Sequence, residues 1–179
     1  MSPILVRPVR EQLEHDRVIR LLQTRFRRRF DVGINPGAER NSPVGTGPAA
    51  VYPDVVLVSQ DRGRKVMAVI EVETVESVNN LEAMAEWIPF GRLKSPFHLY
   101  VPAAMVDVAR RLCSDSNIPV AEIHTYHWIG DEMRFLPIYK APAPPERSAS
   151  PRARTKPKAA KKKPAAKPGK KNGRSPKRK

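Results

Sequence analysis

The chain changes character at Lys140. Up to this residue 18 Lys and Arg nearly balance 17 Asp and Glu, whereas the following 39 residues carry 15 cations and one acid. That last segment also holds eight Pro and no aromatic residue, so it cannot bury enough apolar surface to offset the entropy of ordering. The break predicts a folded domain over residues 1–140 and a disordered, basic Lys/Ala/Pro-rich tail over residues 141–179.

Cysteine content and hydropathy limit the classes of protein that fit. The single cysteine, Cys113, excludes a disulfide framework and a cysteine-rich zinc site. No apolar stretch approaches the roughly 18 residues that a membrane span needs, and residues 1–10 lack the apolar segment typical of a secretory signal. We therefore expect a cytoplasmic protein without a membrane partner.

Hydrophobic periodicity predicts the elements of the folded part. Helices are expected at 9–30, 79–93 and 102–114, and strands at 52–60, 65–74, 97–101, 120–129 and 132–139, with a short strand near 31–34. In the second helix, the apolar face is predicted to comprise Leu81, Met84, Ala85 and Ile88. The Gly- and Pro-rich segment 33–50 is either a cover over a site or a plain surface loop. This order predicts an α/β fold with a mixed central sheet flanked by helices.

The turn Asp61-Arg62-Gly63-Arg64 separates two β-branched runs and predicts a hairpin. If Gln60 opposes Lys65, or Asp61 opposes Arg64, then Asp54 lies directly across from Glu71 in either case. Because side chains alternate along a strand, Glu73 shares the face of Glu71, about 6.6 Å further along. Met67 and Val69 are expected on that face too.

Three clustered acids repel one another unless a cation neutralises them. Carboxylate oxygens suit Mg²⁺ or Mn²⁺, whereas zinc prefers His and Cys. The sequence therefore predicts a divalent metal site formed by Asp54, Glu71 and Glu73. The alternative is that this face of the sheet is simply solvated, in which case the acids need no ion.

The pattern Pro53-Asp54, a hairpin, and then Glu71-Val72-Glu73 resembles the PD-(D/E)XK nuclease superfamily, which has the restriction-endonuclease-like fold. The resemblance spans residues 9–101, in a helix-strand-strand-helix-strand order. It implies that Asp54 and Glu71 bind the metal and that Val72 offers its backbone carbonyl. Glu73 stands where the superfamily usually has a Lys that assists the attacking water. Some restriction-enzyme members carry Glu there, and such an acid would act as a base or bind a second ion.

Other side chains are weaker candidates. Glu11 and His15 extend the apolar face of the first helix toward its start, so Glu11 either joins the acids or simply favours the helix dipole. Lys94 is a candidate for a displaced catalytic Lys or a solvated loop residue. Cys113 is expected in the core. The histidines without zinc-like spacing are interpreted as structural or rim residues, namely His98, His124 and His127.

The cations of the tail suit the phosphate backbone, which they would bind strongly, without sequence preference and in a salt-dependent way. The composition is similar to that of histone-H1-like tails. The expected nucleic-acid contacts include Lys161, Lys162, Lys163, Lys170, Lys171 and Arg178. Lipid contact and a purely solubilising role are the alternatives. In the first helix, the cluster at Arg25 and residues 27–29 is either a second phosphate-contacting patch or a solvated face.

These observations favour a Mg²⁺- or Mn²⁺-dependent nuclease that hydrolyses DNA phosphodiester bonds and is held on nucleic acid by its tail. The alternatives are a catalytically inactive nuclease-fold module that binds DNA, and a nucleoid-associated structural protein. The tail predicts a nucleoid-associated location, or a nuclear one in a eukaryote. A homodimer is compatible with each of these hypotheses.

Overall fold

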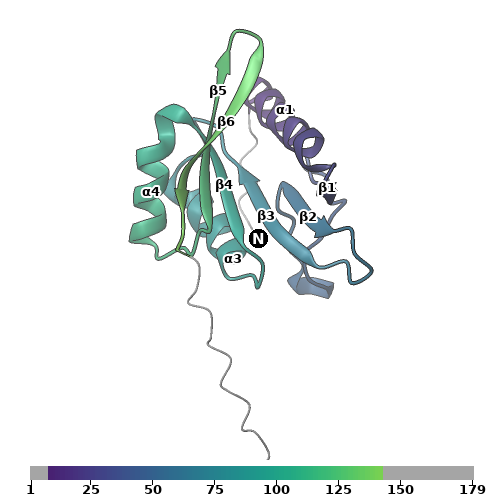
Figure 1. Ribbon diagram of the computed structural model, residues 1–179. Helices are drawn as coiled ribbons and strands as arrows, with labels where there is room; N and C mark the ends of the chain where they lie inside the picture. Colours follow the sequence, from purple (N-terminus) through teal and green to yellow (C-terminus); the bar gives the residue numbers. More distant parts are fainter. Residues whose placement is uncertain (1–7, 143–179) are drawn as a thin grey trace, which may run out of the picture. The chain divides into compact units, whose positions relative to one another are not determined.

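In a computed structural model, which describes residues 8–142, six strands form one sheet with helices on both faces (Figure 1). The strands, in their order across the sheet, are β1 (Phe30–Ile34), β2 (Val55–Ser59), β3 (Val66–Val72), β4 (Phe97–Pro102), β5 (Glu122–Ile129) and β6 (Glu132–Lys140). The pairs β3–β4 and β4–β5 are parallel and the other three pairs are antiparallel. The predicted α/β class and mixed sheet are therefore confirmed.

The helical elements are α1 (Val9–Phe26), η1 (Gly47–Ala49), α2 (Asn80–Glu82), η2 (Ala83–Trp87), α3 (Ile88–Gly91), η3 (Ala103–Met105) and α4 (Val106–Asp115). Among the described residues, no helix has the length and apolar character needed to cross a membrane. The chain divides into two units, Met1–Ala143 and Pro144–Lys179. The predicted nucleic-acid contacts of the tail, Lys161, Lys162, Lys163, Lys170, Lys171 and Arg178, lie outside the described residues.

The first helix is shorter than expected. It ends at Phe26, and Phe30 begins β1, so the prediction of a helix over residues 9–30 was wrong at its end. Phe30 belongs to the sheet, because it pairs with Ser59 on β2. Its ring packs edge-on against the Phe26 ring at a centroid distance of 6.3 Å. The short strand expected near residues 31–34 is confirmed.

The two faces of the sheet carry separate apolar cores. Helix α1 packs over β1, β2 and β3 on one face, and α3 and α4 lie on the other (Figure 1). The core under α1 includes Val18, Ile19, Leu22, Val55, Leu57, Ala68, Ile70 and Val72. The opposite core includes Val56, Val69, Trp87, Phe90, Leu99, Val101, Ala109 and Cys113. Odd-numbered residues at the end of β3 therefore face the α3 side.

The hairpin forms, but its register changes along the strands. Val55 pairs with Ile70 and Leu57 with Ala68, which is the spacing that places Asp54 opposite Glu71. Nearer the turn Val58 pairs with Val66, so both alternatives expected at the turn were wrong by one residue. The additional residue is Met67, which is exposed instead of sharing the face of Val69. A β-bulge thus restores the predicted register at the acids.

The second predicted helix contains a wide turn. One turn of π-helix, Ala83–Trp87, joins α2 to α3, and the predicted buried face was wrong because Leu81 and Met84 are exposed. The buried side chains are Ala83, Trp87 and Phe90, since the two aromatic rings gain most from burial. Pro89, which lacks an N–H and would clash with the carbonyl of residue 85, is accommodated because the wide turn precedes it.

The segment between β1 and β2 is fixed by a buried side chain. The Asn35 amide donates to the carbonyls of Ser42 and Pro53 and accepts from the Ser42 N–H, so it ties both ends of the loop together. Gly33 is required nearby, because a Cβ there would lie 2.3 Å from the Ser42 hydroxyl. The loop is thus anchored at the residue that precedes Asp54.

We expect Leu22→Ala to lower the free energy of unfolding by about 2–5 kcal/mol, because Leu22 is fully buried between α1 and the sheet. Urea denaturation of the full chain measures this change. Leu13→Ala is the matched control on the same helix, since Leu13 is exposed, and its effect should stay within about 0.5 kcal/mol. Equal losses in the two variants would contradict the packing of α1.

Candidate metal centre

The predicted acids meet at one end of the sheet. Asp54 directly precedes β2, Glu71 is the penultimate residue of β3, and Glu73 directly follows that strand. Their exposed fractions are 6%, 4% and 0%, so the alternative of a solvated acidic face is wrong. Buried carboxylates need hydrogen-bond partners or a counter-charge. The protein supplies such partners to different extents for the three acids.

Asp54 links the two strands to α1. Its Oδ2 accepts the Val72 N–H at 2.9 Å and lies 3.0 Å from His15 Nε2. The Asp54 N–H donates in turn to Glu71 Oε2 at 3.2 Å. These contacts place Asp54 beside Glu71 as the sequence predicted, with its carboxylate turned toward the helix.

Glu73 is held on all sides. Trp87 Nε1 donates to Oε1 at 2.6 Å, and the Ser77 hydroxyl donates to Oε2. The backbone is fixed as well, because the Glu73 N–H donates to the Tyr100 carbonyl and the Tyr126 hydroxyl donates to the Glu73 carbonyl. Both the side chain and the backbone of Glu73 therefore have fixed partners.

Glu86, which the sequence did not indicate, forms a three-acid group with Glu71 and Glu73. Glu86 lies in the π-helical turn and is half-buried. One carboxylate oxygen from each of Glu71, Glu73 and Glu86 lies within 4.8 Å of the others. π-helical turns are frequent at functional sites. An acid directly before Trp87, within the helix predicted over residues 79–93, was the only signal in the sequence.

Within the three-acid group, the charged form of the Glu71 carboxyl is disfavoured by its surroundings. Burial raises the pKa of Glu71 well above its ordinary value of 4.5. The neighbouring carboxylates of Asp54, Glu86 and Glu73 raise it further. A bound cation would remove this penalty, and an all-carboxylate donor set with this spacing suits Mg²⁺ or Mn²⁺. The residues present thus fit a hard divalent ion held chiefly by Glu71 and Glu86.

The start of α1 borders the same site. Glu11 and His15 are buried on the helix face that continues to Ile19, as the sequence predicted. Thr74, which follows Glu73 in the chain, donates a hydrogen bond from its hydroxyl to Glu11 Oε1 at 2.6 Å. The second ring nitrogen of His15 lies 3.2 Å from Asp16 Oδ1. Glu11 thus adjoins the three-acid group without belonging to it.

The remaining candidates lie elsewhere. Lys94 is exposed before the start of β4, whereas the acids lie where the parallel strands β3 and β4 end, so Lys94 lies away from the acids. Cys113 is buried in the core as predicted, and burial raises the pKa of its thiol to about 11. His98 and His124 come together on the opposite face of the sheet, and His127 lies further along β5.

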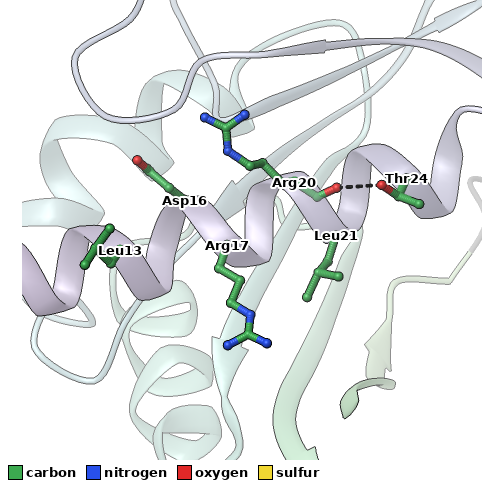
Figure 2. Close-up of a pocket in the computed structure, with 6 residues that line it drawn as sticks. All are labelled: Leu13, Asp16, Arg17, Arg20, Leu21 and Thr24. Atoms are coloured by element: carbon green, nitrogen blue, oxygen red, sulfur yellow. Dashed lines mark hydrogen bonds between the residues drawn. The ribbon is translucent and has the colours of Figure 1, made fainter. Parts of the chain in front are cut away.

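An open hollow lies on the exposed side of α1 (Figure 2). Its lining comes from this helix alone and comprises Leu13, Asp16, Arg17, Arg20, Leu21 and Thr24. Arg17 and Leu21 extend on one side of the helix and Arg20 on the other (Figure 2). The Arg17 guanidinium also lies 4.1 Å from the centre of the Trp128 ring on β5. The hollow thus carries two Arg side chains, one of which contacts an aromatic ring, and none of the clustered acids lines it.

The raised pKa of Glu71 predicts a dependence of stability on pH. The folded state binds its proton more tightly than the unfolded state, so without metal this carboxyl lowers the free energy of unfolding as pH rises above about 4.5. Glu71→Gln should therefore be more stable than the wild type at neutral pH, by a margin that vanishes in acid. Urea denaturation from about pH 4 to 8 in EDTA measures the margin.

Glu76→Gln is the matched control, because Glu76 is an exposed acid just beyond the same strand. Its difference from the wild type should be small at every pH. A Glu71→Gln variant that is less stable than the wild type at neutral pH would show that the folded protein favours the charged carboxylate.

Comparisons of the chain with protein-family models, curated proteins and solved structures found no match. The superfamily that Pro53-Asp54 and Glu71-Val72-Glu73 resemble is therefore neither supported nor opposed by relatives. A function is indicated instead by the buried acids, by the strand order that brings them together and by the cationic side chains of α1.

Proposed function

We propose that the protein is a metal-dependent nuclease that hydrolyses phosphodiester bonds of nucleic acid, with DNA as its substrate. The observation that carries the proposal is the group of Glu71, Glu73 and Glu86, whose carboxylate oxygens lie within 4.8 Å of one another at the end of β3. When bound there, Mg²⁺ or Mn²⁺ lowers the pKa of water and stabilises charge on the phosphate.

In this proposal, some of the protein's residues would bind the ion and others would orient its ligands. Glu71 and Glu86 would hold the ion, with Asp54 as the adjoining acid whose carboxylate the Val72 N–H fixes. The resemblance assigns the Val72 carbonyl as a further ligand. Glu73 has both carboxylate oxygens hydrogen-bonded, so it orients the site and adds negative charge. The buried His15 ring beside Asp54 keeps that carboxylate in place.

Two cationic regions support nucleic acid as the substrate. The exposed side of α1 carries Arg17, Arg20 and Arg25, and the helix is followed by the exposed cations of residues 27–29. Arg17 and Arg25 lie over aromatic rings of β5 and β6, which is an arrangement suited to phosphates and bases. The tail would add sequence-independent contacts to the phosphate backbone.

A second candidate function is DNA binding without cleavage. The observation that favours it is the engagement of Glu73, which occupies the position of the usual Lys and has Trp87 and Ser77 as fixed partners. In this case the acids would be a structural remnant of a nuclease fold. The cationic surface of α1 and the tail would then supply the whole activity.

Cleavage of labelled DNA in Mg²⁺ or Mn²⁺ distinguishes the two functions. Glu71→Gln and Glu86→Gln should each reduce the cleavage rate by roughly 100-fold or more, since each removes a charged ligand. Their affinity for uncut DNA should remain close to that of the wild type, because neither side chain lies on the cationic surfaces. Glu76→Gln is the matched control, because Glu76 is an exposed acid outside the group, and this variant should cut DNA at the wild-type rate.

A wild-type protein that binds DNA but cuts neither single- nor double-stranded DNA in either metal would favour the binding module. Loss of DNA affinity in Glu71→Gln would instead place that residue in the contact surface. Glu86→Gln is informative in a further way, because Glu86 lies beside Glu71 and Glu73 although the superfamily pattern does not include it.

Removal of residues 141–179 should weaken DNA binding and flatten its dependence on salt, because the segment carries 15 cations. Affinity measured from about 50 to 200 mM salt gives the slope. A full-length variant with these Lys and Arg residues replaced by Gln is the matched control for length, and it should behave like the deletion. Equal salt slopes for the wild type and both variants would contradict a role of the tail in binding.

A further inference from the structure

A second group of ligand-type side chains lies on the α1 face of the sheet. His98 on β4 is the register partner of Glu122 on β5, and His124 follows two residues along β5 on the same face. Even-numbered residues of β4 point to this face, as the burial of Tyr100 beneath it shows. The acids at Glu71 and Glu73 face the opposite side, so the two groups are separate.

The donor atoms converge. Glu122 Oε2 lies 2.9 Å from His124 Nε2 and 3.9 Å from His98 Nδ1, and one donor atom from each residue lies within 4.8 Å of the others. In a tetrahedral zinc site, bonds of about 2.0–2.1 Å place neighbouring ligand atoms about 3.3 Å apart. The observed separations of 2.9 and 3.9 Å lie on both sides of that value, so small side-chain rotations would bring the three donor atoms to tetrahedral spacing.

Neighbouring residues hold these side chains in place. The Tyr100 ring stacks on His124 at 4.5 Å with an interplanar angle of 2°. Lys140 Nζ lies 3.1 Å from Glu122 Oε1, which leaves Oε2 directed at the two histidines. Such outer contacts are typical of metal ligands, because they fix the orientation of each donor.

The group is accessible to an ion. The side chains of His98, Glu122 and His124 are 18%, 22% and 14% exposed, since α1 packs chiefly over β1, β2 and β3.

We infer that His98, Glu122 and His124 form a second metal site, which binds one Zn²⁺ ion through two imidazole nitrogens and one carboxylate oxygen. Imidazole ligands select zinc over magnesium, so this site differs in chemistry from the acidic group. Three protein ligands leave a fourth position for water or an anion. The ion would bridge β4 and β5 and thereby stabilise the folded chain.

Zinc titration of the metal-free full chain by calorimetry tests the inference. The wild type should bind one Zn²⁺ at this site, and His98→Ala and His124→Ala should each weaken that binding by about 100-fold or more. His127→Ala is the matched control on β5, and His15→Ala tests the ring beside Asp54. Neither change should affect the site, and excess Mg²⁺ should not displace the zinc.

A measurement on the unaltered protein removes any dependence on how the variants fold. The chain has four histidines, so their ring signals in NMR spectra can be assigned individually. Zinc should shift the rings of His98 and His124 and leave those of His15 and His127 in place. Wild-type protein that binds no zinc, binding that survives both His98→Ala and His124→Ala, or shifts confined to His15 would each overturn the inference.

Discussion

The burial of several carboxylates at one end of β3 is the constraint on which the rest of the site depends. A buried charge is costly unless hydrogen bonds or a counter-charge compensate it. The chain compensates Glu73 with Trp87 and Ser77, and Asp54 with the Val72 N–H. Each of these partners has its position set by the fold.

Glu71 is less fully compensated than Asp54 or Glu73. It accepts the Asp54 N–H, but it lies among other carboxylates and its pKa is raised. A protein without a use for such a group would gain stability from a neutral residue there. The divalent cation proposed above would supply the missing counter-charge.

The sequence predicted the part of the site that depends on local pairing. Asp54 and Glu71 could be placed opposite each other because a hairpin has few registers. The success involved two compensating errors, since the turn is displaced by one residue and the bulge at Met67 restores the register. A bulge has no reliable signature in a single sequence, so the agreement at the acids could not have been assured.

Other parts of the fold depend on contacts between distant residues and were missed. Glu86 joins the acids because a π-helical turn and two aromatic side chains determine which face of the helix is buried. His98 and Glu122 meet because a crossover helix separates two parallel strands that pair directly. Rules for zinc ligands rely on short spacings along one element, so they did not identify this pair.

The two groups of ligands both border strand β4, but they lie on opposite faces of the sheet. The Tyr100 carbonyl accepts the Glu73 N–H at 2.8 Å, while its ring stacks on His124 on the other side of the sheet. Contact through one residue does not by itself couple two sites, because coupling requires an element with two alternative arrangements. Tyr100 lies within a central strand, paired on both sides, and its ring is buried. The strand therefore acts as a rigid partition, on which a hard-metal site and a zinc site can be built independently.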